Sequence, residues 1–190
     1  MDESPSRKKL RDAFIELYSV KSINTISIKD ITSLAGFNRG TFYIHYKDIY
    51  DLLEQIENDI VEDINQKAKD SLYFILYEQN FSKFLTQLEY ISTNAKYFKA
   101  LLGANGSPSF TNKLKTSLKE NIRAEFATGK DTSEKTVEYI IEYIVSAQLG
   151  LITHWLETGF EIPAKEVALV ISKIMASGPV NALQEALGVI

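Results

Sequence analysis

The sequence predicts an all-α fold, with a small three-helix unit at the N-terminus followed by a larger helical bundle. Along most of the 190 residues, apolar side chains recur three and four positions apart, the spacing that places them on one face of a helix. Capping residues, glycines and prolines interrupt these stretches where helices commonly begin and end. We expect residues 1–47 to form the N-terminal unit and residues 48–190 to form the bundle.

The first helix is expected from about Pro5 to Val20. Proline is tolerated in a first helical turn because its missing N–H would have no helical partner there. The apolar side of this helix carries Leu10, Phe14, Leu17 and Tyr18. Residues 21–26 then form a connection to the next helix.

Two short helices joined by a tight turn are predicted next. Ser27 can cap the first of them, with Asp30 three positions on as the reciprocal partner in a capping box. Gly36 can adopt the left-handed backbone conformation that a sharp reversal needs. Asn38 is a good N-cap for the second helix, which begins at Arg39. The buried side of the first helix is expected at Ile28, Ile31 and Leu34.

The remaining helices form the predicted bundle. Their expected ranges are about 48–68, 81–94, 95–102, 109–127, 132–158 and 163–176, with a short extra helix over residues 180–187. Residues 71–78 are rich in aromatic side chains and could form a strand. We expect a helix there because the surrounding chain is helical.

The helix that begins at Arg39 carries side chains suited to docking in the major groove of DNA. Phe42 and Tyr46 lie four residues apart and should face inward, which leaves Tyr43 on another face with its hydroxyl available to a phosphate. Arg39 can pair bidentately with guanine or clamp a phosphate, and both interpretations stay open. The two small residues that follow it let the backbone approach another surface closely, and a helix N-terminus favours phosphate oxygens.

Three segments resemble TetR-type transcriptional regulators. Residues 36–48, GFNRGTFYIHYKD, resemble the recognition segment of that family, and residues 7–18 resemble its basic first helix. Residues 142–160, EYIVSAQLGLITHWLETGF, resemble the C-terminal domain of the subgroup related to regulators of dihydroxyacetone kinase genes. The resemblance implies a homodimer whose N-terminal helix-turn-helix domains bind double-stranded operator DNA. It also implies a C-terminal domain that dimerises and binds a small-molecule effector.

The expected DNA-binding residues follow from this resemblance and from side-chain chemistry. Base-edge readout is assigned to Arg39 and Thr41, while phosphate contacts are assigned to Ser27, Asn38, Gly40 through its backbone, Tyr43, His45 and Lys47. One position departs from the family, which often has a lysine two residues after Lys47, where this chain has Ile49. Either Lys47 replaces that phosphate contact, or DNA affinity is weaker, or Ile49 simply packs under Tyr46.

The long helix over residues 132–158 has an apolar surface too wide for one contact face, so we expect it to contact both its own core and a partner chain. The predicted dimer interface comprises Leu151, Ile152, Trp155, Val167, Val170, Ile171 and Ile174. A predicted effector pocket comprises Phe74, Tyr77, Tyr90, Phe98, Tyr139, Tyr143 and His154, although for any single aromatic residue ordinary core packing is the favoured explanation. His154 could serve at either place.

Composition limits the other functional classes. The net charge is −4, yet residues 1–50 carry more basic than acidic side chains while the remainder is acidic, which suits DNA binding at the N-terminal end. The chain has no cysteine, so it has no disulfide and no cysteine-based zinc site, as is common in a reducing cytoplasm. No apolar run of about 18 residues predicts a membrane span. The N-terminus has no apolar segment typical of a signal peptide.

Catalytic and metal sites are also not expected. The chain's two histidines, His45 and His154, lie far apart without an acidic cluster at metal-ligand spacing. No nucleophile–base arrangement or glycine-rich phosphate loop is present, so we expect no enzyme, no cofactor and no metal. The sequence favours a cytoplasmic, ligand-responsive regulator, a repressor that binds a pseudo-palindromic operator as a homodimer. The alternatives are a helical small-molecule-binding protein or enzyme with a vestigial DNA-binding unit, or a protein–protein adaptor.

Overall fold

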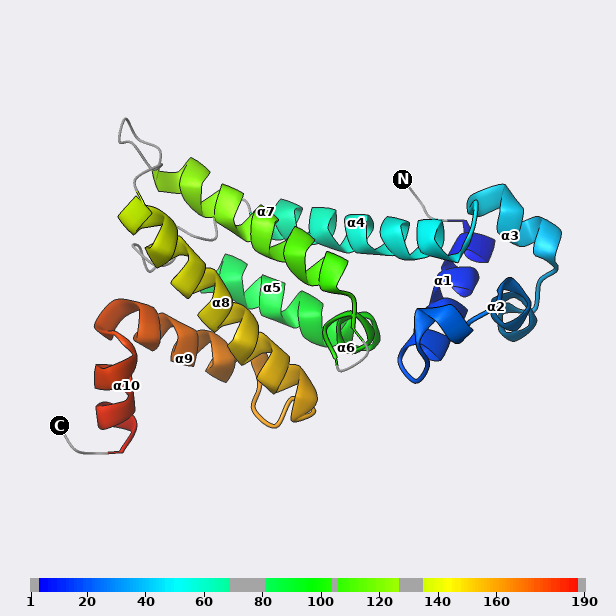
Figure 1. Ribbon diagram of the computed structural model, residues 1–190. Coiled ribbons are helices and arrows are strands. Elements are labelled where there is room, and N and C mark those ends of the chain that lie inside the picture. The colour runs from blue at the N-terminus through cyan, green and yellow to red at the C-terminus, as the bar shows by residue number, and fades with distance from the viewer. Residues whose placement is uncertain (1–3, 69–80, 104–105, 127–134, 188–190) are drawn as a thin grey trace. The chain divides into compact units, whose positions relative to one another are not determined.

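The computed structural model describes residues 4–68, 81–103, 106–126 and 135–187 (Figure 1). Within these ranges all regular secondary structure is helical, which confirms the predicted all-α class. The helices are α1 (Pro5–Tyr18), α2 (Ile28–Ala35), α3 (Arg39–His45), α4 (Ile49–Ala68), α5 (Phe81–Thr93), α6 (Ala95–Leu102), α7 (Pro108–Phe126), α8 (Lys135–Glu157), α9 (Ala164–Ser177) and α10 (Pro179–Ala186), with a 3-10 turn at Ile23–Thr25. The helix expected over residues 71–78 lies outside the described residues.

The chain divides into two compact units, each built from two separate stretches of sequence. Unit 1 comprises Met1–Glu62 and Ala95–Lys113, and unit 2 comprises Asp63–Asn94 and Leu114–Ile190. Helices α1 to α3 therefore share a packing unit with α6 and with the first residues of α7.

The core of unit 1 is formed by side chains that the helical spacing places inward. Its fully buried members include Leu10, Phe14, Ile31, Phe42, Leu52, Ile56, Phe98, Leu101 and Phe110. Aromatic pairs add directional packing, because Phe14 stacks on Tyr18 with ring centroids 5.4 Å apart and Phe42 lies 5.5 Å from Tyr46. Helices α1 to α4, α6 and α7 all contribute side chains to the apolar core of unit 1.

Helix α1 is held on two sides by charged hydrogen bonds. Toward α4, the Nη1 atom of Arg11 donates to the Oδ2 atom of Asp59 at 2.6 Å, and Arg7 Nη2 reaches the same oxygen at 3.0 Å. Toward α6, Lys96 Nζ and Tyr97 Oη donate to Asp12 Oδ1 at 2.5 and 2.7 Å. Burial alone would raise the pKa of Asp12, but these two hydrogen bonds outweigh it, so the pKa lies below its ordinary value.

A buried carboxylate joins α4 to the start of α7 within unit 1. Glu57 is only 2% exposed, and its Oε1 atom accepts a 2.5 Å hydrogen bond from Ser107 Oγ. Its Oε2 atom lies 2.9 Å from Lys113 Nζ. Ser107 also caps α7, since its hydroxyl accepts the backbone N–H of Phe110 at 3.3 Å. The charge that Glu57 brings into the core is therefore paired and hydrogen-bonded.

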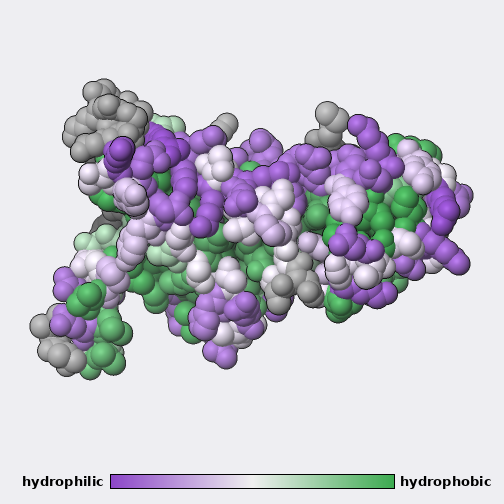
Figure 2. All heavy atoms as spheres, in the orientation of Figure 1, coloured by the Kyte–Doolittle hydropathy of each residue, from purple (hydrophilic) through white to green (hydrophobic). Residues whose placement is uncertain are grey.

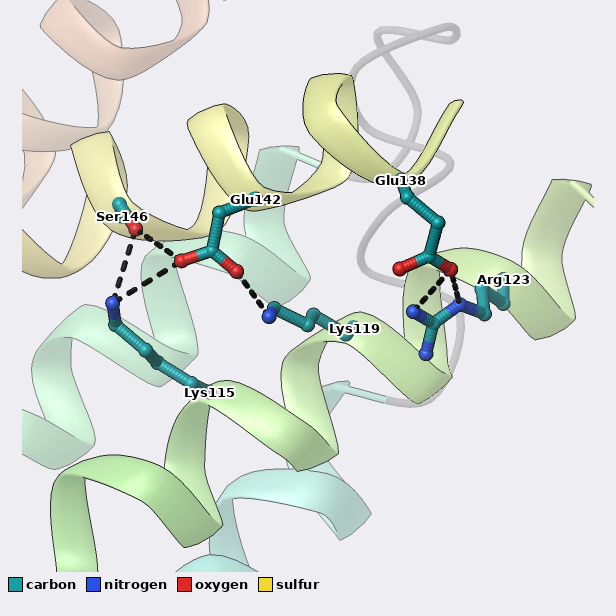
Figure 3. Close-up of polar contacts among 6 residues, drawn as sticks. All are labelled: Lys115, Lys119, Arg123, Glu138, Glu142 and Ser146. Atoms are coloured by element: carbon teal, nitrogen blue, oxygen red, sulfur yellow. Dashed lines mark hydrogen bonds and ion pairs between the residues drawn. The ribbon is translucent and has the colours of Figure 1, made fainter. Parts of the chain in front are cut away.

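Unit 2 is held together by an apolar core and by a ladder of ion pairs. Ile122, Ile141 and Val145 form one buried cluster, while α5 and α10 both pack on α9. Figure 3 shows Lys115 and Lys119 of α7 pointing toward Glu142 of α8, with Arg123 and Glu138 forming the next rung. These contacts lower the pKa of Glu142 to about 2, the hydrogen bond from Lys119 being the largest cause.

The turn between α8 and α9 is fixed by one tryptophan. Trp155 is buried, and its Nε1 atom donates to the backbone oxygen of Ile162 at 2.7 Å. The ring of Phe160 meets it edge-on, with centroids 4.8 Å apart. Gly159 and Phe160 both have positive φ angles, 74° and 66°, and such a conformation is unusual for phenylalanine. In this conformation the backbone N–H of Phe160 donates to the backbone oxygen of Trp155 at 3.0 Å.

Candidate nucleic-acid interface

Helix α3 has one buried side and one open side. Phe42 and Tyr46 are 0% and 2% exposed, as the sequence predicted, and they attach the helix to the core of unit 1. Arg39 and Gly40 are exposed, and Tyr43 is 58% exposed with its ring edge-on to Phe42. The open side therefore carries the arginine and tyrosine assigned to DNA.

The start of α3 is fixed by Asn38. Its Oδ1 atom accepts the backbone N–H of Thr41 at 2.9 Å and lies 3.3 Å from Thr41 Oγ1. A Cβ atom added at Gly40 would lie only 3.1 Å from the same Oδ1 atom. Glycine at this position therefore leaves room for the cap as well as for close approach of another surface. Thr41 itself is half-buried.

Ser27 is engaged in capping α2. Its hydroxyl accepts the backbone N–H of Asp30 at 3.2 Å, and its backbone N–H donates to Asp30 Oδ2 at 3.0 Å, which completes the predicted capping box. The hydroxyl also donates to the same Oδ2 atom at 2.6 Å. Hydrogen bonds from the side chain and backbone of Ser27 lower the pKa of Asp30. The hydroxyl proton of Ser27 is directed at Asp30, so this side chain holds the start of α2 in place.

The turn between α2 and α3 follows the prediction at Gly36 but not at Leu34. Gly36 has a φ of 74°, the left-handed conformation expected there. Leu34 was expected to be buried, and it is exposed instead. Thr32 takes the inward position, since its hydroxyl donates to the backbone oxygen of Ile28 at 2.9 Å and is satisfied within the helix.

His45 lies at the end of α3 and is partly buried. Its Nε2 atom is 2.8 Å from the hydroxyl oxygen of Ser6, which ties α3 to the first turn of α1. This contact occupies the Nε2 atom of a side chain that the sequence assigned to a phosphate. The contact joins residues 39 positions apart, so no local pattern in the sequence indicated it.

The junction between α3 and α4 leaves Lys47 exposed. The backbone N–H of Lys47 donates to Asp51 Oδ2 at 2.8 Å, and the backbone N–H of Asp51 donates to Asp48 Oδ1 at 2.8 Å. The first of these bonds is the largest cause of the lowered pKa of Asp51. Ile49 is half-buried at this junction. The Lys47 side chain is thus presented beside α3 on a firmly held backbone.

The exposed residues of this segment that were not among the predicted site residues include Lys29, Ile44 and Tyr50. Tyr50 donates its hydroxyl to Asn24 Oδ1 at 3.0 Å. Ile44 is 78% exposed, a large value for an isoleucine in a short helix. Its position two residues from both Phe42 and Tyr46 was a signal that it lies opposite the buried side.

The predicted effector pocket is not gathered around one cavity by the described residues. Phe98 belongs to the core of unit 1, beside Phe110, and Tyr90 donates its hydroxyl to Asp63 at 2.7 Å. Tyr139, Tyr143 and His154 are exposed. They are exposed because the inward side of α8 is formed by Ile141, Val145 and Leu149. Tyr139, Tyr143 and His154 lie on the opposite side of that helix. Phe74 and Tyr77 lie outside the described residues.

A cavity of about 270 Å³ lies at the α8–α9 turn. Its lining residues are Leu151, His154, Trp155, Thr158, Glu161, Ile162, Val167 and Val170. Four of these were predicted for the dimer interface, so the cavity and that surface coincide. Trp155, Val167 and Ile171 are buried within their own chain, Leu151, Ile152 and Ile174 are half-buried, and Val170 is exposed.

The described part of the chain contains no group of three or more histidine, cysteine or acidic side chains placed to hold a metal ion. Among the same residues, no helix has both the length and the apolar character needed to cross a membrane.

Comparison with known proteins places this arrangement in a family. The family model described as "Transcriptional regulator C-terminal region" (TetR_C_8) matches residues 78–177, more than half of the chain. No curated protein matches the sequence.

Solved structures of transcriptional regulators share the fold. The dihydroxyacetone kinase operon activator DhaS is 18% identical, with 90% of this chain and 94% of that chain covered and a TM-score of 0.60. A TetR transcriptional regulator from Streptococcus agalactiae 2603V is 19% identical, with coverages of 90% and 93% and a TM-score of 0.63. The fatty acid degradation regulator FadR from Bacillus halodurans is 13% identical, with coverages of 94% and 98% and a TM-score of 0.65. At these identities the likeness concerns the fold alone.

Proposed function

The chain belongs to the TetR family of transcriptional regulators, as the sequence resemblance predicted, and we propose that it is a ligand-responsive repressor. In this proposal a homodimer binds a pseudo-palindromic operator in double-stranded DNA through α3 of each subunit. The observation that carries the proposal is the open side of α3. There Arg39 and Tyr43 are exposed while Phe42 and Tyr46 attach the helix to the core.

The proposed DNA contacts keep the roles expected for most of the site. Arg39 and Thr41 read base edges, and Tyr43 and Lys47 bind phosphates through their exposed side chains. Asn38 and Gly40 contribute backbone close to the duplex. Ser27 and His45 act by holding α2 and α3 in position, because their polar atoms are bonded to Asp30 and Ser6. Functionally, residues 1–47 form the DNA-binding domain, and residues 48–190 form the effector-binding and dimerisation domain.

A second copy of the chain is proposed to cover the open side of α8. Tyr139, Ile140 and Tyr143 are exposed there, and Gly150 follows on the same side with no atom within 4 Å of an added Cβ. Glycine lets two helices approach closely, and exposed aromatic side chains are common in protein interfaces. Across a two-fold axis, the same surface would also cover the cavity beside His154 and Val170.

The dimer is proposed to set the spacing of the two α3 helices at about 34–36 Å, one turn of duplex. A small-molecule effector bound within residues 48–190 would favour one dimer geometry and so shift the fraction of molecules that fit the operator. A tenfold change in occupancy requires about 1.4 kcal/mol of differential binding. In this proposal the protein acts in the cytoplasm, is not an enzyme and needs no cofactor.

Equilibrium DNA binding by the full chain tests this function. The probe is the DNA immediately upstream of its own gene, together with a random-sequence pool for selection of bound sites. We expect specific binding whose affinity falls by about 10³-fold or more between roughly 50 and 200 mM salt, as for a dimer with several phosphate contacts. Arg39→Ala should lower the affinity by about tenfold or more, since each lost base contact costs about 1–3 kcal/mol.

The control variant is Lys165→Ala, which removes an exposed lysine near the start of α9 and should bind DNA like the unchanged protein. Tyr43→Phe should weaken binding to all sequences alike, because it removes a phosphate contact and no base contact. Absence of salt-sensitive binding to both the upstream DNA and the selected pool would reject the proposal. A small-molecule-binding protein with a vestigial DNA-binding unit would then be favoured.

A further inference from the structure

The middle of the exposed side of α3 carries an apolar side chain. Ile44 is 78% exposed, more than the neighbouring Tyr43, and it lies two residues from each of the buried anchors Phe42 and Tyr46. With 3.6 residues per turn, that spacing puts Ile44 on the side directly away from the core. Gly40 lies one turn earlier on the same side and has no side chain. Ile44 therefore supplies the side chain at the centre of this face.

The core of unit 1 gives no reason for an isoleucine at this position. The inner side of α3 is already filled by Phe42, and an exposed isoleucine leaves its apolar surface in water. Isoleucine is also not among the strongest helix formers, so helix stability alone does not favour it. The presence of isoleucine is explained more simply if a binding partner covers this side chain.

We propose that Ile44 reads the C5-methyl group of a thymine in each operator half-site, an inference that rests on the proposed function. An isoleucine side chain has neither a donor nor an acceptor. In the major groove every base edge presents such polar groups, and the thymine methyl group is the apolar feature among them. Arg39 and Tyr43 flank Ile44 on one side of the helix and Thr41 flanks it on the other, so the apolar contact lies between the polar ones.

The test uses the full chain and the site it selects from a random pool. Each thymine of that site is replaced in turn by deoxyuridine, which removes only the C5-methyl group and keeps every hydrogen-bonding atom. In each half-site we expect one thymine whose replacement, made in that half-site alone, weakens binding about fourfold. This is the effect of losing one buried methyl-sized group. Changing both half-sites together should weaken binding about sixteenfold.

Variants of the protein then assign the effect to the side chain. Ile44→Ala should respond less than about twofold to the same replacement, whereas Ile44→Val, which keeps the branch at Cβ, should retain most of the response. Val20→Ala is the matched control, because it shortens another exposed apolar side chain away from α3. It should keep the full fourfold response. Circular dichroism should show unchanged helix content for every variant, since both side chains are exposed.

The outcomes separate this inference from the proposed function. Specific DNA binding without any thymine whose methyl group matters would overturn the role of Ile44 and leave the regulator intact. The same holds if Ile44→Ala keeps the full response to deoxyuridine. If the unchanged protein bound no DNA at all, both the role of Ile44 and the proposed function would be rejected.

Discussion

The segment from α2 to the start of α4 differs from helix α8 in what determines which side chains are buried. In the first segment, contacts three or four residues apart fix the helix starts: Ser27 with Asp30, Asn38 with Thr41 and Asp48 with Asp51. In α8, burial is decided by helices that are distant in sequence, as in the cluster of Ile122 with Ile141 and Val145. Short-range capping contacts can be predicted from neighbouring residues in the sequence. Which side of a helix is buried also depends on other helices that are distant in the sequence.

The largest effect is expected from a pair of neighbouring isoleucines on α8. Ile141 is 4% exposed and Ile140 is 53% exposed, so Ile141→Ala should reduce the free energy of unfolding by about 3 kcal/mol. Ile140→Ala should cost much less at protein concentrations where the chain is monomeric. Urea unfolding followed by circular dichroism at two protein concentrations measures both. A loss for Ile140→Ala that grows with concentration would show that a second copy covers this side, and equal losses in the monomer would contradict the assigned inward side.

A smaller effect is expected from the cap of α3. Asn38→Ala removes the acceptor for the N–H of Thr41 and should cost about 1 kcal/mol of unfolding free energy. Asn38→Asp keeps an acceptor at the same place, so stability should change little. The added negative charge should nevertheless weaken DNA binding, because it lies beside the proposed phosphate contacts. Comparing unfolding midpoints with DNA affinities separates the two roles, and equal DNA affinities for Asn38→Asp and the unchanged protein would place this cap away from the duplex.

The smallest effect concerns acid. The pKa of Glu142 is lowered from 4.5 to about 2, first by its hydrogen bond from Lys119. A carboxyl group with a lowered pKa in the folded state contributes stability above its ordinary pKa and loses it as the pH falls toward the folded value. We therefore expect the unfolding midpoint to fall between pH 4.5 and about 2, and Glu142→Gln to fall less over that window. The group is exposed, so the change should be modest. Parallel curves for the two proteins would remove Glu142 from the ladder in Figure 3 as a source of stability.

The sequence predicted the helices and the caps of the DNA-facing segment well, because proline, glycine and capping residues act on their immediate neighbours. Residues 95–102 were expected as a helix and form α6 with the same bounds. The inward sides were predicted less well: Leu34 is exposed, and Tyr139 and Tyr143 face away from the core. Helical spacing shows which residues share a side but does not say which side meets another helix. The contact between Ser6 and His45 was not predicted either, because it joins residues that are distant in the sequence.

Helix α10 carries exposed apolar surface that the helical pattern alone did not single out. Figure 2 shows hydrophobic residues gathered over this helix. The exposed members there are Val180, Leu183 and Leu187. Ala182 of the same helix is buried, and α10 packs on α9. The stripe at positions 180, 183 and 187 is thus the side of α10 left over after that packing.

The interrupted make-up of unit 1 has a practical consequence for hybrid regulators. Asp12 is hydrogen-bonded to Lys96 and Tyr97, and Glu57 contacts Ser107 and Lys113. Residues 95–113 therefore complete unit 1, which also contains helices α1 to α3. A hybrid that exchanges only the first stretch would leave Glu57 buried opposite foreign side chains. Grafting the DNA specificity of this protein onto another family member therefore calls for transplanting both stretches together, with the junctions placed after Glu62, before Ala95 and after Lys113.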